Sequence, residues 1–184
     1  MDLQNAANRV RSSKRILVLG SSGSGKTTLS IRLGQLLDIE TIHLDARFWK
    51  PGWIATPQQE WRETVLSLIS QPSWIMDGTY ESTLDLRIPA ADTLILVECS
   101  RWTCLWQVLK RKATVADRQR TDAPPGQKLD WAFMRYIWRY PTVTDPYVQE
   151  CILEFGQGKT QVRLHGSPQV QSFLQLLGQS TVSP

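Results

Sequence analysis

The 184-residue sequence has little cysteine and no long hydrophobic run. Its three cysteines are odd in number and form neither a C-x-x-C pair nor a metal-ligand spacing, which argues against a disulfide framework and a zinc site. No apolar stretch approaches the roughly 20 residues of a membrane span, and residues 1–14 lack the apolar segment of a secretory signal. We therefore expect a cytoplasmic protein with reduced thiols and no membrane contact.

Charge is also limited, at a formal net value of +4. A basic protein suits anionic ligands such as nucleotides, but without a dense basic run nucleic-acid binding is possible rather than supported. The length is typical of one domain, and no repeat or boundary divides the chain. We predict a flexible arm over residues 1–14 and a single domain, monomeric or homodimeric, over residues 15–184.

A phosphate-binding motif is present. Residues 20–27 read GSSGSGKT and match G-x-x-x-x-G-K-[ST], between an apolar run at 16–19 and a helical pattern at 26–37. In such P-loops, backbone N–H groups hold the α- and β-phosphates, the lysine reaches the β- and γ-phosphates, and the hydroxyl ligates Mg²⁺. The motif predicts ATP and Mg²⁺ as cofactors, with the nucleotide held by Gly20, Ser21, Ser22, Gly23, Ser24, Gly25, Lys26, Thr27 and Thr28.

Short apolar runs alternate with helical patterns through the rest of the chain. Strands are expected at 16–19, 40–44, 74–76, 93–97 and 161–164, and helices at 26–37, 56–70, 101–112, 129–139, 146–155 and 167–177. This alternation predicts an α/β fold of three layers, in which helices cover both faces of a parallel sheet. Ligands of such sheets bind at the carboxyl ends of the strands.

Two aspartates follow expected strands. Asp77 is the candidate Mg²⁺ ligand beside Thr27, because Mg²⁺ prefers carboxylate oxygen. Alternatively, Asp77 only forms an ordinary Asp-Gly turn. Glu98, at the end of the fourth expected strand, is the other candidate for the ligand. Asp45 either accepts or orients the proton of a substrate hydroxyl, as a catalytic and acceptor-binding residue, or caps its strand. We interpret His43 as structural rather than catalytic.

Arginines are the candidates for phosphate contacts, since phosphoryl transfer places charge on the oxygens of the transferred group. The catalytic candidates flank or lie in a polar segment that can close as a lid, and they are Arg111, Arg118 and Arg120, acting with Lys26. The acceptor candidates, besides Asp45, are Arg47, Arg87, Arg135 and Arg139. For each arginine the alternative is a solvated basic surface. Phe48, Trp49 and Trp53 either pack as a wall or sandwich an acceptor base.

Three blocks of sequence carry a resemblance to a known family. They are the P-loop, the block His43-Leu44-Asp45 with Trp49-x-Pro51-Gly52-Trp53, and the block Asp77-Gly78-Thr79-Tyr80 with Thr83-Leu84-Asp85-Leu86-Arg87. Over residues 14–177 the chain resembles the adenylate-kinase-like P-loop proteins called DNA topology modulation proteins. The resemblance implies a nucleoside monophosphate kinase-like fold with sheet order 2-3-1-4-5, an acceptor-binding insertion near 46–70 and a short lid near 112–128.

These observations define an expected function. Adenylate kinases carry Asp-Gly-Phe-Pro-Arg where this chain has Asp77-Gly78-Thr79-Tyr80-Glu81; the first two residues match and the arginine does not, which argues against adenylate kinase activity itself. We interpret the sequence as an ATP- and Mg²⁺-dependent phosphotransferase, a kinase of a small acceptor such as a nucleoside or nucleotide. The alternative is a P-loop regulator or slow NTPase that acts through a partner such as DNA.

Overall fold

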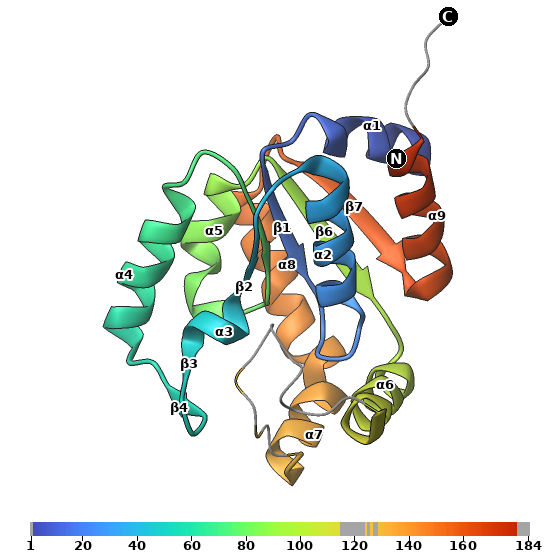
Figure 1. The fold of residues 1–184 in the computed structure, drawn as a ribbon. Helices are drawn as coiled ribbons and strands as arrows, with labels where there is room; N and C mark the ends of the chain where they lie inside the picture. Colours follow the sequence, from blue (N-terminus) through green and yellow to red (C-terminus); the bar gives the residue numbers. More distant parts are fainter. Residues whose placement is uncertain (1, 115–123, 125, 127–128, 180–184) are drawn as a thin grey trace, which may run out of the picture.

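The computed structural model describes residues 2–114, 124, 126 and 129–179, and its centre is a five-stranded parallel sheet (Figure 1). The strands are β1 (Arg15–Leu19), β2 (Thr41–His43), β5 (Trp74–Asp77), β6 (Thr93–Glu98) and β7 (Thr160–His165). They lie in the order β2-β5-β1-β6-β7, and each pairs in parallel with its neighbour. Numbered among themselves, these strands follow the order 2-3-1-4-5, which confirms the predicted P-loop kinase-like fold.

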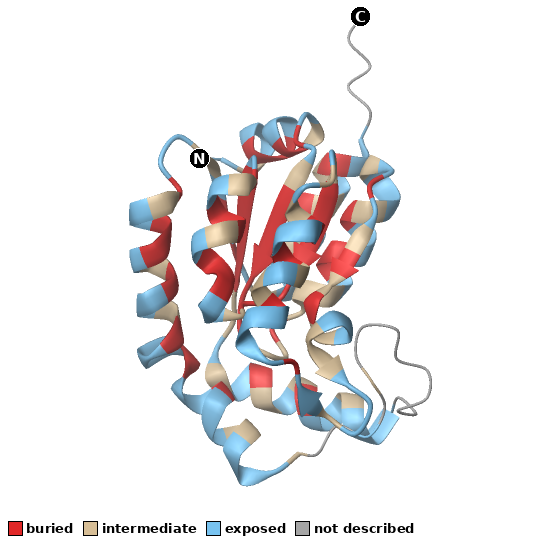
Figure 2. Cartoon of the chain, turned by 90° about the vertical axis from the view of Figure 1, so that its left-hand side faces the viewer, coloured by how far each residue is buried: buried red, intermediate tan, exposed pale blue. Residues whose placement is uncertain are grey.

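Helices cover both faces of the sheet, because successive side chains of a buried strand point to opposite sides. Leu17 and Leu19 of β1 belong to the core that packs against α4 (Gln58–Ile69), α5 (Leu84–Ala90) and α8 (Thr144–Phe155). Ile16 and Val18 belong to the core on the other face, with α1 (Leu3–Arg11), α2 (Lys26–Leu37) and α9 (Gly166–Gly178). Figure 2 shows the buried strands between helices whose outer surfaces are exposed.

The N-terminal segment is not a flexible arm, contrary to the sequence-based prediction. Residues 3–11 form α1, which starts at the N-cap Asp2 and lies against α9 (Figure 1). Its buried side chains are Ala6, Ala7 and Val10. Arg11 donates hydrogen bonds to the carbonyl groups of Leu176, Leu177 and Gln179 at the end of α9. These carbonyls have no partner within their own helix, so Arg11 caps α9 while α1 covers its apolar face.

The region after β2 consists of short elements that precede α4. They are α3 (Leu44–Phe48) and a two-stranded hairpin of β3 (Trp49–Lys50) and β4 (Ile54–Ala55). After β5 come the 3-10 helix η1 (Glu81–Thr83) and α5, a helix that the sequence patterns did not predict. At seven residues and with Pro89 inside it, α5 is too short to show a helical period of its own.

Three elements follow β6 and lie at the carboxyl end of the sheet. They are α6 (Arg101–Thr114), α7 (Trp131–Arg139) and the 3-10 helix η3 (Tyr140–Thr142), which leads into α8. The predicted lid at 112–128 lies for the most part outside the described residues. Within the part of the chain that the structure describes, no helix has both the length and the apolar character required to cross a bilayer.

Candidate functional site

The glycine loop joins β1 to α2, and close packing sets its shape. A Cβ on Gly20 would lie 2.6 Å from the Val97 carbonyl oxygen, and one on Gly23 would lie 2.3 Å from the Cys104 carbonyl oxygen. Both distances are shorter than any van der Waals contact, so only glycine fits at these positions. Gly25 is the N-cap of α2 and provides no side-chain hydrogen bond. The first N–H groups of α2 are therefore available to an anion.

Lys26 begins α2 and bends back over this loop. Its Nζ donates a hydrogen bond to the Ser21 carbonyl oxygen at 3.3 Å, and both Lys26 and Ser22 line the adjacent cavity. Thr27 is half-buried and Thr28 is exposed in the first turn of the same helix. A lysine ammonium group next to a glycine loop at a helix N-terminus is the arrangement that P-loops use for phosphates.

Asp77 ends β5, beside β1, and is 4% exposed. The register of β2 with β5 places His43 opposite it, and the His43 Nδ1 lies 2.9 Å from Asp77 Oδ1. The other oxygen, Oδ2, is buried and has no hydrogen-bond partner among the described residues. An unpaired buried oxygen is costly, so this carboxylate is suited to a further donor or a cation. Mg²⁺ prefers carboxylate and hydroxyl oxygens, so the unpaired Oδ2 is compatible with the predicted Mg²⁺ role of Asp77 and Thr27, which stays a prediction.

His43 holds the Asp77 carboxylate, a contact that the sequence did not reveal. The sequence alone favours a structural role for this histidine, and its link to Asp77, 34 residues away, depends on the register of β2 with β5. Parallel strands are joined by long crossovers, so no local pattern reports which residues they bring together. The available signal is that both residues lie within one residue of the carboxyl ends of expected strands.

Arg87 does not face an acceptor, which corrects the sequence-based assignment. Its side chain is fully buried, and its guanidinium donates hydrogen bonds to the carbonyl oxygens of Gly78 at 2.9 Å, of Tyr80 at 2.8 Å and of Thr79. Its Nε also donates to the Thr83 hydroxyl at 3.1 Å. Burial lowers the pKa of Arg87. With its donors directed at these backbone carbonyls, Arg87 holds the 78–80 loop in place.

The 78–80 loop in turn positions Tyr80 and Asp45. Tyr80 has a φ of 33°, in the left-handed region, and its hydroxyl donates to Asp45 Oδ1 at 2.6 Å. Its ring packs on Phe48 and Trp61. Burial, with the nearby Asp45 charge as a second cause, raises the pKa of Tyr80. Asp45 lies in α3 rather than at the end of the second strand, since β2 stops at His43.

Thr79 links this loop to the glycine loop and to η3. Its hydroxyl donates to the Gly20 carbonyl oxygen at 3.2 Å and lies 3.1 Å from the Tyr140 hydroxyl. Burial raises the pKa of Tyr140, although the Thr79 hydrogen bond opposes this shift. The sequence alone assigns no role to Thr79 or Tyr140, because their roles come from contacts between segments distant in the chain.

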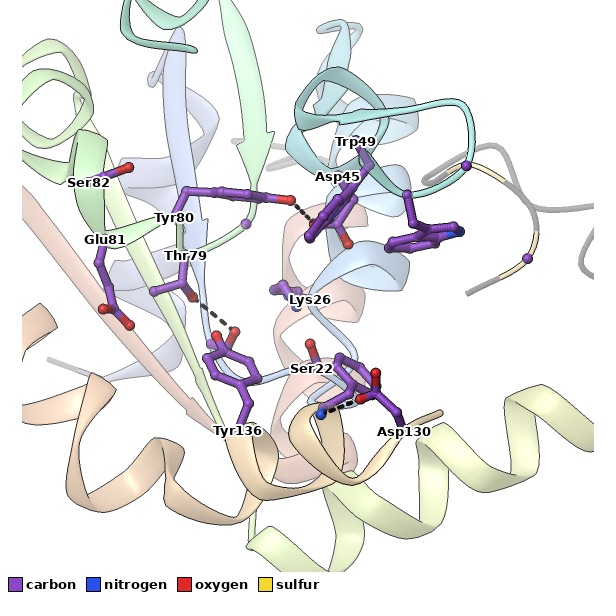
Figure 3. Close-up of a pocket in the computed structure, with 16 residues that line it drawn as sticks. Ser22, Lys26, Asp45, Trp49, Thr79, Tyr80, Glu81, Ser82, Asp130 and Tyr136 are labelled. Atoms are coloured by element: carbon purple, nitrogen blue, oxygen red, sulfur yellow. Dashed lines mark hydrogen bonds between the residues drawn. The ribbon is translucent and has the colours of Figure 1, made fainter. Parts of the chain in front are cut away.

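A cavity of about 910 Å³ lies between the glycine loop, α3 and its hairpin, the 78–82 segment and α7 (Figure 3). Its described cation is Lys26, and its carboxylates are those of Asp45, Glu81 and Asp130. Its aromatic walls come from Trp49, Trp53, Tyr80, Phe133 and Tyr136. The cavity therefore brings the predicted phosphate-binding lysine and the predicted acceptor aspartate to one space.

The other predicted arginines are placed differently. Arg47 is exposed and Arg111 is half-buried. Neither of them lines this cavity. Arg135 and Arg139 are exposed on α7, which presents Phe133 and Tyr136 to the cavity instead. Their assignment to the acceptor is therefore not supported by the geometry. Arg118 and Arg120 lie outside the described residues.

Three solved structures with a similar fold are two kinases and one putative kinase. Shikimate kinase from Acinetobacter baumannii, in complex with shikimate, is 15% identical, with a TM-score of 0.56 over 96% of this chain and 99% of that one. A putative kinase from Chloroflexus aurantiacus is 16% identical, with a TM-score of 0.53 over 87% and 94%. Deoxyadenosine kinase from M. mycoides with bound dATP is 13% identical, with a TM-score of 0.50 over 88% and 96%.

At these identities the similarity establishes the fold alone, which is that of the nucleoside monophosphate kinase-like P-loop proteins. No family model matches the sequence, and no curated protein matches it. The resemblance to DNA topology modulation proteins therefore stays a prediction. What the protein does has to be argued from the cavity.

Proposed function

We propose that this protein is an ATP-dependent phosphotransferase that acts on a small hydroxyl acceptor, a nucleoside or a nucleotide. One observation carries the proposal: Lys26 of the glycine loop and Asp45 of α3 line the same cavity. A phosphate donor held at Lys26 and an acceptor held at Asp45 would share one space. Phosphoryl transfer depends above all on such positioning and on electrostatic stabilisation.

The donor side is built from the glycine loop. The backbone N–H groups of residues 20–28 and the Lys26 ammonium would hold the triphosphate. The Thr27 hydroxyl and the unpaired Oδ2 of Asp77 would hold Mg²⁺, and His43 keeps that carboxylate oriented through its other oxygen. When bound, Mg²⁺ would neutralise charge on the phosphate oxygens. We further propose Arg111, Arg118 and Arg120 as candidates for contacts to the transferred group.

The acceptor side provides a base. The acceptor hydroxyl oxygen would attack the γ-phosphorus, the bond from that phosphorus to the β–γ bridging oxygen would break, and ADP would leave. The hydroxyl proton would pass to the Asp45 carboxylate. Tyr80 restricts the orientation of this carboxylate by donating to its Oδ1, which leaves the second oxygen for the acceptor.

The test is ADP formation from Mg·ATP with a panel of nucleosides, nucleotides and small hydroxyl compounds. We expect turnover that depends on an acceptor, and a loss of about 100-fold or more in Lys26→Ala, because the charge on the phosphates goes unneutralised. Lys14→Ala is the matched control, since Lys14 is exposed at the opposite end of β1. It should keep full activity, and both variants should unfold at the wild-type urea concentration.

Two results would contradict the proposal. One is transfer that persists in a folded Lys26→Ala protein. The other is slow ATP hydrolysis that no compound of the panel accelerates, which would leave a nucleotide-binding regulator that works through a partner.

A further inference from the structure

We propose that the acceptor is an uncharged nucleoside and that nucleoside monophosphates and other anionic acceptors are rejected. This inference rests on the proposed kinase function and narrows its substrate class. It follows from the charges and the rings around the acceptor half of the cavity, and from where the candidate arginines are placed.

The acceptor half carries negative charge on three elements. Asp45 comes from α3, Glu81 from η1 and Asp130 from the N-cap of α7, and Figure 3 shows their side chains around the cavity with Lys26 between them. Among the described lining residues, Lys26 is the cation that opposes them. In a kinase the P-loop lysine is engaged by the donor phosphates. An acceptor phosphate would then face carboxylates in a partly enclosed space, where like charges repel strongly.

The carboxylates still have oxygens to offer. Asp45 accepts from Tyr80 with Oδ1, and Asp130 accepts from the Phe133 backbone N–H with Oδ1 at 2.8 Å. Within the described residues, the second oxygen of each makes no further hydrogen bond. Carboxylate oxygens only accept, so they select donors: sugar hydroxyls and the exocyclic amino groups of bases. Both kinds of donor are present in nucleosides.

Arginines suited to an acceptor phosphate are placed elsewhere. Arg87 is directed at backbone carbonyls inside the protein. Arg47, Arg135 and Arg139 are exposed and do not line the cavity. A bidentate arginine is the usual means of holding a phosphate or a carboxylate. In the described part of the chain, the cavity has carboxylates where an anionic acceptor would need arginines.

The rings of the cavity indicate a flat acceptor. Trp49 and Trp53 have ring centroids 5.2 Å apart and are tilted by 44°, and both line the cavity together with Tyr80, Phe133 and Tyr136. Aromatic side chains stack on the face of any nucleobase. A cationic amino sugar would also pair with the carboxylates, but it has no planar group that could stack on the aromatic side chains of the cavity.

The experiment measures kcat/KM for nucleosides and for their own 5′-monophosphates, with saturating Mg·ATP. We expect each accepted nucleoside to exceed its monophosphate by about 100-fold, because a pocket rejects a ligand whose charge is left unpaired. Equal or higher kcat/KM for the monophosphate, or activity confined to amino sugars, would overturn the inference while the kinase function stands. Turnover that no acceptor raises would instead remove the kinase function itself.

A charge-neutral variant links the preference to its cause. Glu81→Gln keeps the shape of the side chain and removes its charge, so the nucleoside-to-monophosphate ratio should fall by about tenfold. Glu63→Gln is the control, because Glu63 is exposed on α4 and does not line the cavity; it should keep the wild-type ratio. An unchanged ratio in a folded Glu81→Gln protein would show that this carboxylate does not select the acceptor.

Discussion

Gly23 stands at a variable position of the phosphate-binding motif, yet the structure leaves it no room for a side chain. An added Cβ would lie 2.3 Å from the Cys104 carbonyl oxygen and 3.0 Å from a Val108 methyl group. The glycine loop therefore rests directly on α6, an element more than 75 residues away by sequence number. The motif describes the contacts of the loop with phosphate, and the neighbouring helix adds a constraint of its own.

Gly23→Ala should destabilise the protein and weaken ATP binding. A left-handed φ costs an alanine about 1–2 kcal/mol, and overpacking against a rigid backbone adds about 1–3 kcal/mol. The control is Gly158→Ala, because Gly158 has a comparable φ of 74° against 83°, but its added Cβ meets nothing within 4 Å. Urea unfolding and ATP titration of the two variants measure the difference. Equal losses of stability and ATP affinity in the two variants would show that the close contact of Gly23 with α6 adds no cost of its own.

Arg87 also shows that the chemical type of a residue does not reveal where its side chain points in the fold. An arginine beside the expected acceptor site is a reasonable phosphate ligand by residue type. In the structure it donates to the carbonyl oxygens of Gly78, Thr79 and Tyr80, and it supports a tyrosine held at positive φ. Because Tyr80 in turn donates to Asp45, a chain of hydrogen bonds and backbone connects Arg87 to the Asp45 carboxylate.

At the scale of elements, the N-terminal segment forms the helix α1 instead of the flexible arm that the sequence predicts. The segment is polar overall, with its apolar residues on one narrow face, so its composition resembles that of a loop or a tail. Ala6, Ala7 and Val10 become buried only because α9 and the sheet provide an apolar surface for them. Small side chains let the two helices approach closely, and Arg11 then reaches the end of α9.

Val10→Ala should therefore lower the free energy of unfolding by about 2 kcal/mol, from lost burial and the cavity left behind. Val10 is fully buried. The control variant, Leu153→Ala, removes more carbon atoms, but from a side chain that is 75% exposed. It should change stability by less than about 0.5 kcal/mol. Urea denaturation compares the two variants. A flexible arm would give the opposite order, with Val10→Ala the milder change.

At the scale of the whole molecule, three tyrosines join the sheet to the elements beyond its carboxyl end. Tyr80 follows β5, Tyr136 lies in α7 and Tyr140 begins η3. Burial raises the pKa of all three phenols. Ionising Tyr80 or Tyr140 in place would put a charge in a poorly solvated region, whereas Tyr136 is 39% exposed. This couples the stability of the fold to alkaline pH.

The sign of the pH effect follows from the raised pKa values. Unfolded chains lose phenolic protons near pH 10, while the folded protein keeps them, so the unfolded state binds fewer protons there. Stability is complete below about pH 10 and should fall above it by up to about 1.4 kcal/mol per pH unit for each of Tyr80 and Tyr140, whereas the more exposed Tyr136 should contribute less. Urea unfolding against pH measures the slope, and Tyr140→Phe should reduce it, because Tyr140 is buried. A stability that stays constant from about pH 9 to pH 11 would contradict this account.

The sequence by itself determined the phosphate-binding loop and the α/β fold. Residues 20–27 form one contiguous stretch whose spacing reports its own geometry, and five apolar runs alternating with helical patterns specify a covered parallel sheet. Its strand order came from a resemblance that rests on the same contiguous blocks. These features are local, because hydrophobic period and turn chemistry act over a few residues at a time.

Tertiary structure alone decided the rest of the site. The pairing of His43 with Asp77 depends on strand register, the inward turn of Arg87 depends on the carbonyls of a loop several residues away, and α1 depends on α9. The cavity beside the glycine loop is lined by residues between positions 20 and 136. A sequence pattern shows which side chains are present. Which hydrogen bonds and ion pairs those side chains form is determined only when segments distant in the sequence pack together.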